Sequence, residues 1–242
     1  MTAVVLTRNE ERALARALTS LPRGMAVLVL DAQSTDRTQE IARSHGATVV
    51  ERPWSDFVDA RRFALERVQT RWVLMLDADE ALDRELRDAI VAAPRDTDGY
   101  LLSRTTFFCG KPIRIWSNER LLRLFRRDAV WLEARPASGG HAALHERWMC
   151  SGSVSTLPGV LLHESYPDVA AYRRKFDRYT SIEAEGVNAS RSSVAAAHAK
   201  ALLRFAWLTI VRAELLDGWR GIYVAWFSAL YPAVVARKAW RR

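Results

Sequence analysis

The sequence predicts an α/β fold in which a mostly parallel sheet is flanked by helices. Short apolar runs alternate with segments of helical periodicity through the first eighty residues, which is typical of parallel sheets with helices on both faces. The run at residues 72–76 has no polar interruption, as expected for a strand that is covered on both faces. Polar residues follow three of these runs, at the edge where such sheets bind ligands.

Each expected element has its own local signal. Strands are expected at residues 3–6, 26–30, 47–51 and 72–76, which are rich in apolar side chains. A first helix, with Asn9 as its candidate N-cap, carries Leu14, Leu18 and Leu21 on one face. A second helix is expected at residues 37–45, where Gly46 ends it, and a third from about residue 55 to 68.

The carboxyl ends of these strands carry three polar clusters. They are residues 7–10, Asp31 and residues 77–80. Because ligands of open α/β sheets bind beyond these ends, three clusters at one edge predict a nucleotide site. The chain contains neither GxGxxG nor GxxxxGK[ST], which argues against an ordinary dinucleotide fold and against a P-loop.

Asp77 and Asp79, with Glu80 beside them, form the most informative of the three clusters. Two carboxylates one residue apart suit Mg²⁺ or Mn²⁺, which takes one or two protein carboxylates and completes its shell with water and substrate phosphates. The alternative is that these acids only begin the next helix, because acidic residues stabilise a first helical turn.

The composition places limits on the class of protein. With 242 residues and 27.4 kDa, the chain can form one large domain with an appendage. Cys109 and Cys150 fit no zinc motif, and unpaired thiols indicate a reducing compartment. The N-terminus lacks the pattern of a signal peptide, so we expect the catalytic part to be cytoplasmic.

The C-terminal tail is basic and aromatic. Residues 198–242 contain eight Lys and Arg against two acidic residues, in a chain whose net charge is +8. The uncharged stretch between Arg220 and Arg237 is shorter than the ~20 residues of a spanning helix, and Pro232 interrupts it. We therefore expect helices that lie in an anionic membrane interface. Packing on the domain or a homo-oligomer contact is the alternative, and no motif indicates nucleic acid.

The order of motifs resembles the inverting family 2 glycosyltransferases of the GT-A fold. The segments that carry this resemblance are VVLTRNEE (4–11), DAQSTDRT (31–38) and LDADE (76–80). Later segments are similar to one branch, the lipopolysaccharide-core glucosyltransferases that modify heptose. They lie at residues 122–127, 144–146, 162–166, 178–185 and 217–221.

The resemblance implies roles for individual residues. Those expected to contact the nucleotide sugar are Thr7, Asn9, Glu10, Asp31, Arg61, Asp77 and Arg123. Independently of the family, a carboxylate such as Asp31 can accept a hydrogen bond from the imide N–H of uracil. The expected metal ligands are Asp77, Asp79 and His163, with Asp79 preferred over Asp77 as the direct ligand. Arg126 is a further candidate for neutralising the diphosphate.

Inversion also requires a base that removes the proton of the acceptor hydroxyl. Glu146 is the candidate that the resemblance implies; Glu133 is its alternative, and a surface ion pair would be the trivial explanation of either. Residues 1–165 would then form the glycosyltransferase domain, with the nucleotide sugar held by 1–100 and the acceptor by 101–165. Residues 166–242 would form a helical region for membrane or partner contact.

Together these expectations give one functional hypothesis. The protein would transfer a sugar, most simply glucose from UDP-glucose, to a saccharide or lipid-linked acceptor such as a lipopolysaccharide inner-core heptose, at the cytoplasmic membrane face. A nucleotidyltransferase that makes sugar nucleotides is disfavoured, because no glycine-rich, lysine-bearing triphosphate loop follows the first strand. A catalytically silent module that binds nucleotide sugars or lipid surfaces is the alternative of another class.

Overall fold

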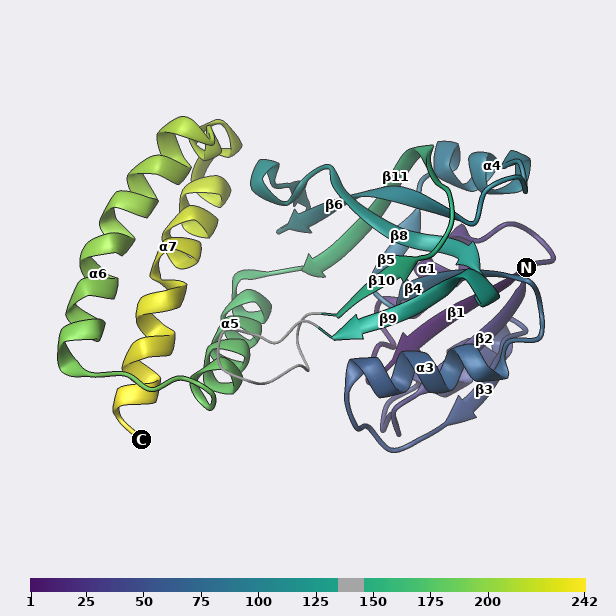
Figure 1. The fold of residues 1–242 in the computed structure, drawn as a ribbon, viewed down its shortest axis with the longest axis horizontal. Helices are drawn as coiled ribbons and strands as arrows, with labels where there is room; N and C mark the ends of the chain where they lie inside the picture. The colour runs from purple at the N-terminus through teal and green to yellow at the C-terminus, as the bar shows by residue number, and fades with distance from the viewer. Residues whose placement is uncertain (135–145) are drawn as a thin grey trace. The chain divides into compact units, whose positions relative to one another are not determined.

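The computed structural model describes residues 1–134 and 146–242 (Figure 1). Two compact units can be separated within these residues. The first contains residues 1–105, 118–134 and 146–163, and the second contains residues 106–117 and 164–242. Residues 106–117, which the sequence assigns to the acceptor half, thus belong to the same unit as the C-terminal helices.

The first unit is built on a mixed sheet. Its strands β3 (Thr48–Glu51), β2 (Ala26–Asp31), β1 (Thr2–Thr7) and β4 (Trp72–Asp77) are parallel neighbours in that order. The sheet continues with β8 (Glu119–Arg126), β6 (Gly99–Phe108), β11 (Val154–Tyr166) and β5 (Glu80–Leu82). The pairs β4–β8, β8–β6 and β11–β5 are antiparallel. A separate antiparallel pair joins β9 (Val130–Ala134) to β10 (Glu146–Cys150).

Helices cover both faces of this sheet. On one face, Leu74 and Leu76 of β4 pack with residues of α1 (Leu14–Ser20), α2 (Thr38–Ser44) and α4 (Arg84–Ala92). On the other face, Val73 and Met75 pack with α3 (Phe57–Arg67) and with residues of β9 and β10. Since side chains alternate along a strand, both faces of β4 are apolar, which explains its uninterrupted run. The predicted α/β fold is confirmed.

The second unit is mainly helical. Its elements are β7 (Lys111–Pro112), η1 (Arg114–Trp116), α5 (Val169–Ala184), α6 (Arg191–Ala206), a π-helical turn η4 (Trp207–Val211), η5 (Glu214–Asp217) and α7 (Gly218–Trp240). Helices α6 and α7 lie side by side, joined by η4 and η5 (Figure 1). Near the end of α7, Lys238 Nζ donates to Asp177 Oδ1 at 2.6 Å and to Thr180 Oγ1 at 2.9 Å of α5.

Within residues 1–134 and 146–242, one continuous helical segment, Arg191–Val211, is long and apolar enough to cross a membrane by length and composition alone. It consists of α6 and η4. The segment considered from the sequence is a different one, the uncharged stretch between Arg220 and Arg237. Only 11% of its most apolar window is buried within the protein. This segment therefore presents apolar side chains that the fold itself does not cover.

A carboxyl group lies buried where η1 meets η5. Glu214 is 0% exposed, and its Oε1 accepts a hydrogen bond of 2.8 Å from the Ile115 N–H. Burial raises the pKa of Glu214 to about 7, and the hydrogen bond from Ile115 offsets this effect only in part. The group therefore changes its charge close to neutral pH.

We expect Glu214→Gln to change the pH dependence of stability. Because the folded protein raises the pKa of Glu214 from 4.5 to about 7, the stability that the protonated form provides is present below pH 4.5 and is lost as the pH rises through 7. The variant should match the wild type at low pH and exceed it by ~1–3 kcal/mol in unfolding free energy at about pH 8. Thermal unfolding across this range measures the difference. Glu66→Gln, at an exposed carboxyl of α3, is the control. If the difference in stability between Glu214→Gln and the wild type does not vary with pH, the raised pKa of Glu214 is contradicted.

Candidate functional site

Asp31 joins the loops that follow β1 and β2. It pairs with Thr7 in the β1–β2 register and is 0% exposed. Its Oδ2 accepts from Thr7 Oγ1 at 2.8 Å and from Ser34 Oγ at 2.6 Å. Its Oδ1 accepts from the Ser34 N–H and from Gln39 Nε2, both at 2.8 Å. Both oxygens of the predicted base-binding carboxylate are thus engaged by donors from its own loop and from α2.

Asn9 and Glu10 belong to the same pair of loops. The Thr35 N–H donates to Asn9 Oδ1 and the Glu10 N–H donates to Thr38 Oγ1, each at 2.8 Å. Asn9 has a left-handed φ of 56°, which asparagine tolerates better than most residues. The prediction that Asn9 caps the first helix is wrong, because α1 begins later and its N-cap position is Ala13 without a side-chain hydrogen bond. The Asn9 side chain instead fixes the second loop against the first.

Asp77 lies between two arginines. Arg61 of α3 approaches its Oδ1 with Nη2 at 2.7 Å, and Arg123 of β8 approaches its Oδ2 with Nη2 at 2.8 Å. The two arginines are only 5% and 6% exposed, respectively. The structure thus brings together three residues that the sequence assigns to nucleotide-sugar binding, and we call this group the arginine clamp.

The arginine clamp continues into a chain of alternating charges. Glu80 is 0% exposed, and its Oε1 accepts from Arg123 at 2.9 Å and from Arg104 at 3.1 Å. Arg104 in turn pairs with Glu119 at 2.6 Å. The Asp77 N–H donates to Glu80 Oε2 at 3.0 Å. Arg104 was not predicted from the sequence, because Ser103 and Thr105 beside it make this part of β6 polar and no local signal singles it out.

The arginine clamp fixes the charge of Asp77. Burial alone would raise the pKa of Asp77, but attraction to Arg123 and then to Arg61 outweighs it and holds the pKa well below its usual range. Burial would lower the pKa of Arg123, yet Asp77 and Glu80 raise it above the usual value. Asp77 is therefore ionised, and both of its oxygens face guanidinium groups. It would have to exchange one of these contacts to bind a cation.

Asp79 and His163 form the second pair at this edge. Asp79 lies in the turn between β4 and β5, and His163 of β11 stands opposite Glu80 in the β11–β5 register. His163 Nε2 lies 3.3 Å from Asp79 Oδ2, and the two side chains are 15% and 17% exposed, respectively. Arg16 of α1 donates to the Asp79 carbonyl at 3.4 Å. Two of the three residues that the sequence assigns to the metal, Asp79 and His163, thus lie side by side although they are far apart in the sequence.

These donors suit a hard divalent cation. Among residues 1–134 and 146–242, no group of three or more His, Cys, Asp or Glu side chains is arranged to hold a metal ion. Two protein ligands are nevertheless enough for Mg²⁺ or Mn²⁺ when substrate phosphates and water supply the rest of the shell. One carboxylate and one imidazole side by side therefore fit such an ion.

The two candidate bases lie in the β9–β10 pair. Glu146 begins β10 opposite Ala134, and its side chain, with Leu144 and His145 before it, lies outside the described part of the structure. Glu133 is exposed on β9 opposite Arg147. The choice between Glu146 and Glu133 thus stays a prediction.

Arg126 is not brought to the acidic edge. It pairs with Asp98 and with Asp128, at 2.7 Å each. It lies at the C-terminal end of β8, opposite Trp72, which begins β4, whereas Asp77 ends that strand. The structure thus gives it a role in tying β8 to neighbouring loops.

Comparison with known proteins assigns the family. The model of glycosyl transferase family 2 matches residues 2–149, which include the loops, the arginine clamp and Asp79. The chain belongs to glycosyltransferase family 2. His163 lies outside the matched region, so its place beside Asp79 is an observation of this structure.

Two relatives illustrate the range of similarity. An uncharacterized glycosyltransferase of Rickettsia prowazekii is 38% identical over 191 residues, which cover 75% of this chain and 65% of the relative. A lipopolysaccharide core biosynthesis glycosyltransferase of Rhizobium meliloti is 30% identical over 138 residues, covering 52% of this chain and 51% of the relative. The chain thus spans about half to two thirds of the length of these two relatives, and only 35% of another from Rickettsia bellii.

The fold has a counterpart among solved structures. A mannosyltransferase from Pyrobaculum calidifontis, solved with GDP-mannose and Mn²⁺, superposes with a TM-score of 0.53 at 16% identity. The match covers 98% of this chain and 86% of that one. The GT-A fold and the family predicted from the sequence are confirmed.

We expect Glu80→Gln to destabilise the first unit. The change removes a buried charge that two arginines share, so that Arg123 keeps only Asp77 and Arg104 keeps only the exposed Glu119. Breaking a buried ion pair by removing one partner costs about 3–5 kcal/mol in comparable sites. Urea unfolding measures the loss. Glu119→Gln, at the 50% exposed end of the same chain of charges, should cost less than ~1 kcal/mol. Similar losses in both variants would show that burial does not set the strength of the network.

Proposed function

We propose that this protein is a metal-dependent inverting glycosyltransferase. It would transfer a sugar, most simply glucose from UDP-glucose, to a saccharide or lipid-linked acceptor. The observation that carries the proposal is the Asp79–His163 pair beside the arginine clamp, at the carboxyl edge of the sheet in a family 2 chain. This arrangement offers a cation site and buried positive charge at the same edge.

The nucleotide would lie against the loops that Asp31 joins. Thr7, Asn9 and Glu10 would line the base and ribose together with Asp31. An imide N–H could bind Asp31 only in place of a present donor, and Gln39 is the best candidate to leave because its Nε2 is shared with Glu51 at 3.1 Å. The mannosyltransferase of the same fold was solved with a nucleotide sugar and Mn²⁺, which supports this class of donor.

Asp79 and His163 would hold Mg²⁺ or Mn²⁺ together with the donor diphosphate. When bound, the cation supplies positive charge against the departing diphosphate. Arg61 and Arg123 keep Asp77 ionised beside Asp79, and either guanidinium could turn toward a phosphate oxygen. The structure thus provides Asp77 as a further metal ligand only if the arginine clamp rearranges when the donor binds.

The transfer itself would be a single displacement. The acceptor hydroxyl attacks the anomeric carbon on the face opposite the diphosphate, its proton passes to the Glu146 carboxylate, and the bond from carbon to the phosphate oxygen breaks. A carboxylate within hydrogen-bond reach of the hydroxyl is sufficient for this role. Because the attack comes from the opposite face, the configuration at the anomeric carbon inverts.

A lipopolysaccharide inner-core heptose is the acceptor that we favour. The relative from Rhizobium meliloti, named for lipopolysaccharide core biosynthesis, supports it. Such an acceptor is anchored in a membrane, so the enzyme would work at the cytoplasmic membrane face. The basic and aromatic character of residues 198–242 supports peripheral attachment there.

We expect Asp79→Ala to abolish metal-dependent donor binding, because it removes the carboxylate that lies 3.3 Å from His163. Thermal shift with a panel of sugar nucleotides, with and without Mn²⁺, measures this; a donor at a hundred times its dissociation constant stabilises by ~2.7 kcal/mol. Asp88→Ala, at an exposed carboxylate of α4, is the matched control. Metal-dependent stabilisation that persists in Asp79→Ala would contradict the site, and consumption of nucleoside triphosphate would indicate nucleotidyl transfer instead.

Glu146→Gln should separate binding from transfer. Donor affinity should stay within about twofold, whereas transfer to the acceptor should fall by ~10²–10⁴ if Glu146 is the base. Isothermal titration and product formation measure the two effects, with Glu133→Gln as the paired variant. Loss of transfer in Glu133→Gln alone would move the role to that residue. Equal loss of donor binding in both variants would show that neither acts as a base, and binding without turnover in the wild type would indicate a silent module.

A further inference from the structure

The helical turn that joins α6 to α7 exposes a large apolar surface. Ten of the fourteen large hydrophobic side chains that are exposed in the described part of the chain lie between residues 202 and 226. Leu203 of α6 is 75% exposed, Ile210 of η4 is 76% exposed and Leu216 of η5 is 69% exposed. We call this surface, within residues 202–226, the hairpin tip. Exposed large hydrophobic side chains concentrated in one part of a protein are typical of surfaces that bind a partner, a ligand or a membrane.

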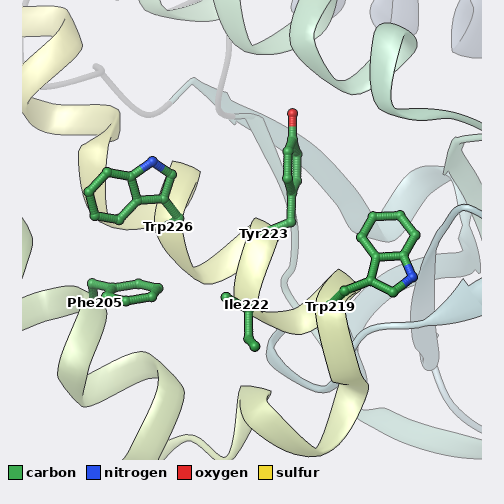
Figure 2. A pocket seen from close by; sticks show the side chains of 5 residues that line it. All are labelled: Phe205, Trp219, Ile222, Tyr223 and Trp226. Carbon is green, nitrogen blue, oxygen red and sulfur yellow. The ribbon is translucent and has the colours of Figure 1, made fainter.

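The hairpin tip contains a hollow of about 510 Å³ with aromatic walls (Figure 2). Phe205 and Trp226 lie on one side of it, Trp219 lies on the other, and Ile222 lies between them. The rings of Phe205 and Trp226 meet edge to face, with 5.3 Å between their centres. Four of the five lining residues come from the first half of α7, and Phe205 comes from α6. The walls offer carbon atoms to an occupant and almost no polar partners.

The exposed side chains are not what holds the two helices together. Leu208, Ala225 and Ala229 form the buried contact between η4 and α7, and each is at most 2% exposed. Phe108, Tyr172 and Val224 form a second buried cluster in the same unit. The hairpin tip is therefore apolar surface in excess of what the packing of α6 and α7 uses.

The exposed charge around the hairpin tip is mainly positive. After Glu185 the chain has only two acidic residues, Glu214 and Asp217. Glu214 is buried, and Asp217, whose side chain is 12% exposed, pairs with Arg114 at 3.1 Å. The cations near the tip are Lys200, Arg204, Arg212 and Arg220.

Two of these arginines lie against tryptophan rings of the tip. The Arg212 guanidinium carbon is 5.8 Å from the centre of the Trp207 ring, and that of Arg220 is 4.8 Å from the centre of the Trp219 ring. Rings next to cations are the combination found at the headgroup level of membranes. A second copy of this surface would bring like charges together, which disfavours self-association as the way to cover it.

We propose that the hairpin tip inserts into the interfacial layer of an anionic lipid bilayer, with an acyl chain in the hollow between Phe205 and Trp219. This deepens the membrane location that belongs to the proposed function, because it names the surface and the lipid charge. Leu203, Ile210 and Leu216 would enter the acyl region, and Arg204, Arg212 and Arg220 would meet the headgroups.

Insertion would be shallow, although Arg191–Val211 is long enough to span a bilayer. Lys200 and Arg204 lie within that segment, and a charge at the centre of a bilayer is unfavourable. In addition, α6 packs along α7, whose far end is held to α5 by Lys238. Helices of this kind bury their apolar side by about 5–10 Å in the interface.

Co-sedimentation of the full chain with vesicles tests the proposal. The wild type should bind vesicles of phosphatidylcholine with phosphatidylglycerol, bind phosphatidylcholine alone weakly, and be released by salt or by alkaline carbonate. The double variant Leu203→Glu/Ile210→Glu should bind the anionic vesicles at least ~10-fold more weakly. Val91→Glu, at a 63% exposed position of α4, is the matched control and should bind like the wild type. Brominated acyl chains should quench tryptophan fluorescence of the wild type and not of the double variant.

Several results would overturn the proposal. They are equal vesicle binding by the wild type and the double variant, retention of the protein on membranes in alkaline carbonate, and a wild-type dimer that the double substitution converts to a monomer. Metal-dependent donor binding is measured on the same preparations. Leu203 and Ile210 lie outside the candidate site, so the two proposals can fail separately. A wild type that binds the donor but not the anionic vesicles would overturn only the proposal for the hairpin tip. A wild type that binds the vesicles but not the donor would overturn only the proposed function.

Discussion

The pairing of Asp77 with Arg61 and Arg123 is the constraint on which the candidate site depends. A carboxylate that is largely removed from water is stable only when cations and hydrogen-bond donors replace the water that it loses, and the Asp77 side chain is 27% exposed. Here those cations come from α3 and β8, and Glu80 extends the same charges to Arg104 of β6. The network therefore fixes several elements of the first unit around the end of β4. The turn that carries Asp79 begins directly at this fixed point, which is why Asp79 meets His163 although 84 positions separate them.

The two loops beside the arginine clamp follow the same logic on a smaller scale. Asp31 collects hydrogen bonds from Thr7, Ser34 and Gln39, so one buried carboxylate sets the course of the chain after both β1 and β2. Asn9 adds a bond between the loops. Polar groups at the carboxyl edge thus serve first as structural ties, and any ligand must compete with or build on them.

The sequence predicted what depends on neighbours along the chain. The four parallel strands and their helices follow from apolar runs and periodicity. Residues 73–76, for example, are all apolar, and this directly predicts a strand that is buried on both faces. It missed contacts between segments that are far apart in the sequence. Arg123 reaches Asp77 because β8 pairs with β4, Arg61 reaches it from α3, and Arg104 of β6 reaches Glu80 of β5. Asn9 misled because a good capping residue also suits a left-handed loop position. His163 was placed by family resemblance, since a lone histidine carries no local signal.

The arginine clamp has a consequence for the energetics of recognition. A free arginine side chain has about 2 kcal/mol of rotamer entropy, and freezing it on contact with a ligand weakens the association by part of that amount. In this protein Arg61 and Arg123 are already immobilised by Asp77 before any phosphate arrives. The entropy that both arginine side chains lose is therefore lost when the protein folds, and not when a ligand binds. An anion that takes over one of these contacts therefore exchanges one carboxylate for another negative group, with little further loss of side-chain freedom.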